Sequence, residues 1–224
     1  MRENRCTKEV PVIVCWSVKG GSGTTVVSSA LAVMLGAHSH DGARVVDLAG
    51  DVPATLGMAE PVGLGVADWL MSPDDVDSDS LNNLLVSVNS NLSALPRGNS
   101  PLDTNARFEL LAHTLSGMQQ SVVVDAGSGV ACSPFIAYAR TSYLVIRPCY
   151  LALRRAAALQ QPPTGIILIT EDGRALGRRD VEAVVGAPVV AEVPYESSIS
   201  SAVDAGLLAG RLPTTLGQHL APLI

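Results

Sequence analysis

The sequence is poor in aromatic residues and in charge: aromatics make up 4% and charged residues 16% of its 224 positions. Hydrophobic residues make up 47%, so a core must consist mainly of Val, Leu, Ile and Ala, as in buried parallel strands and their covering helices. An intrinsically disordered chain is excluded, because disorder requires low hydrophobicity and high net charge. The length is one that a single α/β domain commonly reaches.

Positive charge is especially scarce, and the formal net charge is −6. Arginines occur as pairs such as Arg154-Arg155 and Arg178-Arg179, and nothing in the sequence indicates the basic face that nucleic-acid binding requires. Residues 216–224 contain no lysine or arginine and include a proline, which disfavours a basic amphipathic helix for membrane attachment. We therefore see no strong sign of nucleic-acid or membrane binding.

The four cysteines show no C-x-x-C spacing and have no histidines nearby, which is typical of reduced thiols in a cytosolic protein. Residues 1–9 are polar and charged, unlike a secretory signal. No apolar run reaches the roughly 20 residues that would span a membrane. We expect a cytoplasmic protein.

Short β-branched runs alternate with helical patterns along the whole chain, which predicts a mostly parallel sheet covered by helices on both faces. Strands are expected at residues 10–16, 44–48, 92–95, 122–125, 142–147, 165–170 and 189–193. Helices are expected at residues 25–37, 66–71, 77–86, 101–118, 151–160, 178–185 and 197–205, with a loop at 49–65. The prediction is a single three-layer α/β domain over residues 10–215, with an N-terminal tail at 1–9 and a C-terminal tail at 216–224.

A glycine-rich loop joins the first expected strand to the first expected helix. Glycines let backbone N–H groups converge on an anion, and the helix N-terminus adds partial positive charge. Alternatively, Thr24 or Thr25 merely caps a helix after a flexible turn. We favour a phosphate site, because the loop follows the carboxyl end of a strand. Its expected cofactor-binding residues are Lys19, Gly20, Gly21, Ser22, Gly23, Thr24 and Thr25, with the Thr25 hydroxyl also a ligand of Mg²⁺.

This loop resembles the deviant Walker A motif of the ParA/MinD family of P-loop ATPases, K-G-G-x-G-K-[ST]. The pattern is matched by Lys19, Gly20, Gly21, Gly23 and Thr25. The resemblance implies a P-loop NTPase fold, ATP or ADP with Mg²⁺ as cofactors, and a homodimer in which Lys19 reaches the partner's phosphates. The second lysine of the pattern, which contacts the β- and γ-phosphates, is Thr24 here.

Loss of one such electrostatic contact commonly costs ~10²–10³ in rate, so we expect weak or absent hydrolysis. Substitution of Lys19 for the missing charge remains an open alternative. Relatives also carry D-x-D after the second strand, where Asp47 fits the first aspartate and Ala49 occupies the second position. Asp51 is a candidate replacement, with an ordinary turn residue as the equally weighted alternative. Lys19, Asp47 and Asp51 are the catalytic candidates.

Two later motifs complete the expected site. The strand ending at Asp125 resembles a Walker B strand, whose carboxylate binds Mg²⁺ through water, although a carboxylate capping a turn is the alternative interpretation. The segment around Pro194 resembles the I-P-x-D/E turn that borders the base, which makes Pro194 a cofactor-binding candidate. Thr170 and Glu171 stand where relatives carry an adenine-reading asparagine, so preference for adenine over guanine stays open.

Within the family, residues 50–57 and 64–70 most resemble the CpaE/TadZ branch and the septum-site-type relatives. The resemblance implies a nucleotide-responsive positioning or scaffold protein of pilus or septum machinery. It also implies recruitment to a pole or to membrane-associated machinery through a protein partner of a localisation or secretion system. An active ParA-type ATPase that partitions chromosomes or plasmids and a nucleotide-free pseudo-ATPase that serves as a binding module remain alternatives.

Overall fold

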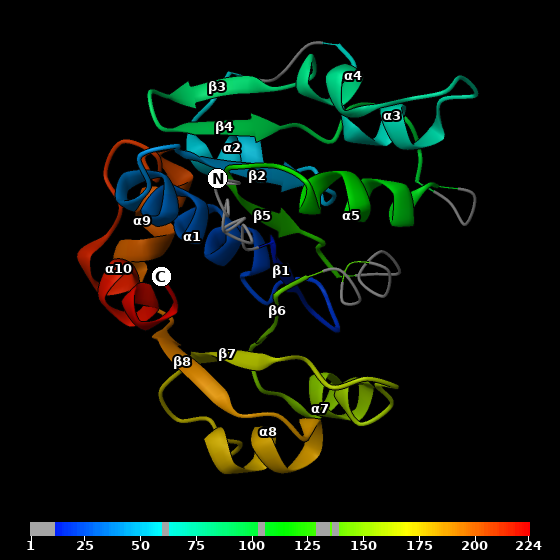
Figure 1. The fold of residues 1–224 in the computed structure, drawn as a ribbon. Helices are drawn as coiled ribbons and strands as arrows, with labels where there is room; N and C mark the ends of the chain where they lie inside the picture. The colour runs from blue at the N-terminus through cyan, green and yellow to red at the C-terminus, as the bar shows by residue number, and fades with distance from the viewer. Residues whose placement is uncertain (1–11, 60–62, 103–105, 129–134, 136–138) are drawn as a thin grey trace, which may run out of the picture.

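An eight-stranded sheet with the order β3-β4-β2-β5-β1-β6-β7-β8 forms the centre of the computed structural model (Figure 1). The structure describes residues 12–59, 63–102, 106–128, 135 and 139–224, so the expected tail at 1–9 lies outside the described residues. The strands are β1 (Val12–Trp16), β2 (Ala43–Asp47), β3 (Val86–Asn89), β4 (Leu92–Leu95), β5 (Ser121–Asp125), β6 (Thr141–Ile146), β7 (Gly165–Thr170) and β8 (Val189–Pro194). Neighbouring strands are parallel except β3, which is antiparallel to β4.

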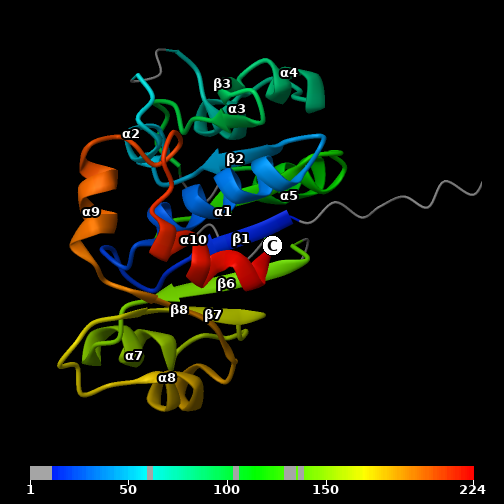
Figure 2. The same ribbon diagram turned by 90° about the vertical axis from the view of Figure 1, so that its left-hand side faces the viewer.

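Helices cover both faces of the sheet and give three layers (Figures 1 and 2). One face carries α1 (Thr24–His38), α2 (Val52–Leu56), α9 (Ser197–Asp204) and α10 (Thr214–Leu220), which is followed by the 3-10 turn η1 (Ala221–Leu223). The other carries α3 (Val66–Met71), α4 (Ser78–Asn82), α5 (Phe108–Ser116), α7 (Tyr150–Ala156) and α8 (Arg178–Val185). The predicted fold class, a single α/β domain with a mostly parallel sheet, is confirmed.

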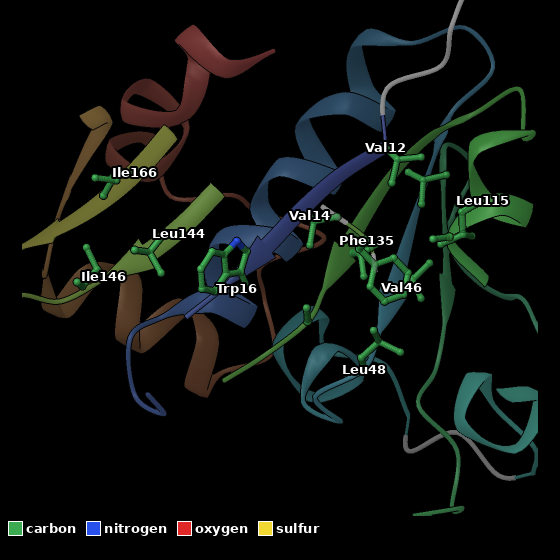
Figure 3. Close-up of a cluster of buried hydrophobic side chains, with 14 of the residues drawn as sticks. Val12, Val14, Trp16, Val46, Leu48, Leu115, Phe135, Leu144, Ile146 and Ile166 are labelled. Carbon is green, nitrogen blue, oxygen red and sulfur yellow. The ribbon is translucent and has the colours of Figure 1, made fainter. Parts of the chain in front are cut away.

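Alternate side chains of each strand supply the two apolar cores, because successive residues of a strand point to opposite faces. Val14 and Trp16 of β1 pack on the α5 and α7 side, together with Leu144 and Ile146 of β6 (Figure 3). Trp16 is buried there, and its indole Nε1 donates a hydrogen bond to the Ser142 hydroxyl at 2.9 Å. The strands are therefore buried on both faces, as their continuous β-branched sequences predict.

Four expected elements differ clearly from the structure, among them the helix expected at 151–160, which ends at Ala156. The segment 49–65, an expected loop, contains α2, which has proline in its first turn and whose Val52 N–H donates to the buried Asp47 carboxylate. The helix expected at 77–86 ends at Asn82, and β3 follows as an edge strand because its hairpin pairing with β4 prevails over helical periodicity. The helix expected at 101–118 begins only at Phe108.

The C-terminal segment packs on the α1 face of the sheet. Leu216 and Leu220 of α10 are fully buried, and the helix contacts β8 and α1. Within the described residues, no helix combines the length and the apolarity that crossing a membrane requires.

The topology places one edge of the sheet for ligand binding. The chain passes from β1 through α1 to β2 on one side of β1, and from β5 to β6 on its other side, so the direction in which strands are added reverses at β1. A crevice forms outside the carboxyl ends of the strands at such a switch point, and ligands of open α/β sheets bind there. The glycine-rich loop that follows Trp16 lies at this position.

Candidate functional site

Residues 17–23 form the turn between β1 and α1, and side-chain hydrogen bonds fix its shape. The hydroxyls of Ser17 and Ser22 both donate to the Lys19 carbonyl oxygen at 3.0 Å. Gly21 and Gly23 have φ values of +74° and +84°, the left-handed region that glycine enters without steric cost. The loop is therefore a folded turn rather than a flexible connection.

The N-terminus of α1 has no side-chain cap. Gly23 is the N-cap residue, so the alternative in which Thr24 or Thr25 caps this helix is wrong. The first N–H groups of a helix lack intrahelical partners and carry partial positive charge. In this fifteen-residue helix they are available to an anion held by the loop.

A cavity of about 670 Å³ opens at this helix end. It is lined by the loop and by the segments that follow β2, β4 and β5, namely Ser17, Gly20, Gly21, Ser22, Gly23, Thr24, Thr25, Val26, Leu48, Ala49, Asp51, Arg97, Leu102, Phe108, Ala126, Gly127 and Ser128. The structure thus brings together six of the seven predicted loop residues. Lys19 does not line the cavity, and its ammonium donates to the carbonyl oxygen of Gly20 at 3.0 Å.

Two buried carboxylates lie side by side below the cavity, because Asp47 of β2 and Asp125 of β5 are register partners. Asp125 Oδ1 accepts a hydrogen bond from the Gly127 N–H at 3.1 Å. Burial raises the pKa of Asp125 to about 6, and the negative charge of Asp47 acts in the same direction, whereas the Thr25 side chain and the Gly127 N–H oppose the rise. The charged form of Asp125 is thus incompletely compensated by the protein.

Asp47 is engaged by the backbone that follows it. Its Oδ1 accepts from the N–H groups of Ala49 and Gly50 at 3.0 and 2.6 Å, and its Oδ2 accepts from Val52 N–H at 3.1 Å. Burial raises the pKa of Asp47, although these three hydrogen bonds oppose the rise. The carboxylate shapes the loop that leads to Asp51, which is exposed and lines the cavity.

The residues around Asp125 fit a hydrated Mg²⁺ ion. Asp125 Oδ2 is buried without a hydrogen-bond partner among the described residues, and Thr25 lines the cavity next to this carboxylate. No group of three acidic, histidine or cysteine ligands occurs in the described part of the chain. Mg²⁺ does not need one, because it keeps several waters and usually takes one or two carboxylates plus phosphate oxygens.

A second, apolar cavity of about 190 Å³ adjoins the first, since Gly23 and Val26 line both. Pro194, Ile169 and Tyr195 line it, so the cofactor-binding candidate Pro194 lies in a cavity that shares Gly23 with the glycine-rich loop. Its size and lining suit a flat apolar group held next to the anion cavity.

Ion pairs occupy the end of β7, where the family resemblance leads one to expect an adenine-reading asparagine. The Glu171 carboxylate lies 2.6 Å from the guanidinium groups of both Arg147 and Arg174. Hydrogen bonds from Arg147 and then Arg174 lower the pKa of Glu171. Arg147 also lies over the Tyr195 ring, 4.4 Å from its centroid, so it braces one rim of the apolar cavity.

Sequence reasoning missed two arginines at this edge. Arg97 lines the larger cavity, and Arg155 of α7 donates from Nη1 to the Val18 carbonyl oxygen at 3.1 Å, which supports the glycine-rich loop from the side. A signal for Arg97 was present, because it follows the expected strand 92–95 at the same sheet edge. The contact of Arg155 with Val18 could not be expected from the sequence, since it spans 137 positions of the chain.

Comparison with solved structures identifies the fold. A ParA family ATPase from Chlorobium tepidum TLS superimposes with a TM-score of 0.75 at 20% identity, over 96% of this chain and 98% of that one. The septum site-determining protein MinD from Pyrococcus horikoshii OT3, complexed with Mg-ADP, gives 0.70 at 20% identity over 96% and 94%. A complex of a Cyanothece McdA variant with ATP gives 0.70 at 15% identity over 96% of each chain. The sequence matches no family model and no curated protein.

Proposed function

From the ParA/MinD-type fold we propose that this chain binds ATP or ADP with Mg²⁺ and acts as a nucleotide-responsive positioning or scaffold protein. The observation that carries the proposal is the cavity at the N-terminus of α1, where Thr25 of the lining lies next to Asp125, whose Oδ2 has no hydrogen-bond partner among the described residues. Two of the structural neighbours are named as complexes with Mg-ADP and with ATP, which supports the same ligand class here.

Each part of the proposed site has a separate role. The N–H groups of residues 20–25 bind the phosphate chain, and Thr25 and Asp125 hold Mg²⁺, Asp125 through water. The apolar cavity beside Pro194 receives the base. Bound Mg²⁺ supplies positive charge that offsets the phosphate oxygens. Asp47 acts indirectly, since it fixes the loop that carries Asp51 toward the cavity.

We assign weak or absent hydrolysis to the chain. Two positions that carry charge in the ParA/MinD motif are neutral here, namely Thr24 and Ala49, and both line the cavity. Thr24 can donate one hydrogen bond but supplies no charge to a developing transition state. Asp51 lies two positions after Ala49 and lines the cavity. It is therefore our candidate for orienting water.

Lys19 supports a nucleotide-dependent homodimer. In the single chain its ammonium is satisfied by its own Gly20 carbonyl and does not line the cavity. Contact between Lys19 and the phosphates of a second copy matches this placement. The dimer would then recruit a protein partner of a pilus, septum or comparable localisation machinery, in the manner of CpaE/TadZ-type proteins. A MinC:MinD complex among the structural neighbours supports partner recruitment as a use of this fold.

Titration with a fluorescent ATP analogue, with and without Mg²⁺, tests the proposal. We expect saturable binding that Mg²⁺ strengthens in the wild type, and that Asp125→Ala makes insensitive to Mg²⁺. Arg179→Ala is the matched control, because Arg179 is exposed on α8 and lines neither cavity. Absence of binding in the wild type would overturn the proposal and leave a nucleotide-free binding module.

Two further measurements on the same samples test hydrolysis and dimerisation. Phosphate release should remain near background, and sedimentation should show a nucleotide-dependent dimer that Lys19→Ala abolishes. Rapid phosphate release that Lys19→Ala removes would instead establish a working ATPase and contradict the assignment of weak hydrolysis.

A further inference from the structure

The larger cavity holds a single cationic side chain among the described residues. Of the residues that line it, only Asp51 and Arg97 carry charge, and Lys19 lies outside the lining. A phosphate chain bound there would meet backbone N–H groups, hydroxyls, one carboxylate and one guanidinium. Arg97 is therefore the described side chain best placed to offset phosphate charge from within the same chain.

The guanidinium of Arg97 is half-buried and makes no hydrogen bond and no ion pair with the described residues. By contrast, Arg147 and Arg178 are both paired with glutamates. A guanidinium carries five N–H donors in a planar fork that matches phosphate oxygens, so its free donors suit an anionic ligand.

The backbone that carries Arg97 is held firmly against α3. The carbonyl oxygens of Pro96 and Arg97 accept hydrogen bonds from the N–H groups of Val66 and Ala67, each at 2.8 Å. The Asp68 carboxylate accepts from the residues that follow, including the hydroxyl of Ser100 at 2.8 Å. This segment cannot drift away from the cavity without breaking these bonds.

The neighbouring glycine leaves space for the arginine stem. A Cβ atom placed on Gly50 would lie 3.3 Å from Arg97 Cδ, closer than most such contacts, and Gly50 has a φ of +107°. The loop shaped by Asp47 therefore passes directly beside the aliphatic part of Arg97. Two separately fixed segments, one after β2 and one after β4, thus set the position of this side chain.

We propose that Arg97 binds the terminal phosphates of the nucleotide and supplies the positive charge that Thr24 does not. This inference rests on the proposed nucleotide site. Thr24 and Arg97 line the same cavity although they come from α1 and from the segment after β4. The positive charge that the motif carries in the glycine-rich loop is therefore supplied here by another segment of the same sheet edge. A phosphate-binding role predicts dependence on the number of ligand phosphates, which a purely structural role does not.

Isothermal titration of the full chain with ATP, ADP, AMP and adenosine, each with Mg²⁺, tests the inference. Arg97→Ala should weaken binding of ATP and ADP by roughly 10- to 100-fold, the range of a charge-assisted hydrogen bond. It should leave the affinity for adenosine unchanged, and the loss of affinity for AMP should lie between these two cases. Arg97→Lys should recover part of the loss. Arg179→Ala changes the net charge equally and should leave every affinity unchanged.

Moving the positive side chain from position 97 to position 24 gives the sharpest test. Adding Thr24→Lys to Arg97→Ala should restore ATP affinity to within a few fold of the wild type. The same Thr24→Lys change alone should give a smaller gain, because Arg97 is already present.

Three results would overturn the inference. Wild-type ATP affinity in Arg97→Ala would do so while leaving the proposed function intact. Equal loss of ATP and adenosine affinity in a variant whose unfolding midpoint is unchanged would show that Arg97 shapes the cavity instead. Absence of nucleotide binding in the wild type would remove the proposed function itself, together with this inference.

Discussion

Replacement of Asp125 by asparagine should change the pH dependence of stability in the nucleotide-free protein. Burial raises the pKa of this carboxyl from 3.8 to about 6. The unfolded chain releases the proton near the ordinary value, whereas the folded chain keeps it until about pH 6. The folded state therefore binds more protons between about pH 4 and pH 6, and its stability falls as pH rises through that window.

The size of the effect follows from the same difference. A pKa raised from 3.8 to about 6 corresponds to about 3 kcal/mol of unfolding free energy, which is lost in full above about pH 6. Asparagine has a similar shape and does not titrate. The unfolding free energy of Asp125→Asn minus that of the wild type should therefore be about 2–3 kcal/mol larger at pH 7.5 than at about pH 4.

Urea unfolding of both proteins at these two pH values measures the effect. The difference between them reports the titration of Asp125 together with its coupling to Asp47, because the other titrating groups are shared. Any constant cost of burying the asparagine amide cancels when the two pH values are compared. A difference in stability that stays constant with pH, or that moves in the opposite direction, would refute the buried, incompletely compensated state of this carboxylate.

Two further substitutions test how the loops around the site are held. Asp47→Ala leaves the N–H groups of the loop 49–52 without their acceptor and should cost about 2–5 kcal/mol, measured by urea unfolding; a change below about 0.5 kcal/mol would contradict these three hydrogen bonds. Gly57→Ala would make a Cβ atom overlap the Gly206 carbonyl oxygen at a φ of +72°. It should cost at least about 3 kcal/mol, against about 1 kcal/mol for Gly173→Ala, which has a φ of +78° but open space; equal costs would exclude the clash.

The fold was predictable where chain-local signals were strong. The β-branched runs of β1 and β5 and the long apolar pattern of α1 identify buried strands and a covering helix, and their alternation predicts the parallel sheet. The edge hairpin of β3 and β4 was not predictable in the same way, because β3 is mostly exposed and its pairing depends on β4. Helical periodicity was misleading there, since it ignores a partner strand.

The residues of the candidate site were likewise predictable only where a short motif of adjacent residues carries them. The glycine-rich loop, Thr25 and Asp125 could be found in the sequence, because each follows directly from a strand end and a short motif. The sequence also showed Thr24 at the position where the motif that the loop resembles carries a lysine. Whether Lys19 compensates for it could not be read from spacing, since a side chain's direction depends on how the loop folds.

The sequence by itself determined the chemistry of the glycine-rich loop and the alternation of the central strands with their long covering helices, because both depend on residues adjacent in the chain. Only the tertiary structure decided which distant groups share the cavity. It placed Arg97 in the cavity that the loop lines, left Lys19 outside the lining, and set Asp47 next to Asp125. The physical reason is that parallel strands gather their carboxyl ends at one edge whatever their separation in sequence, and burial there alters the charge state of the groups that meet.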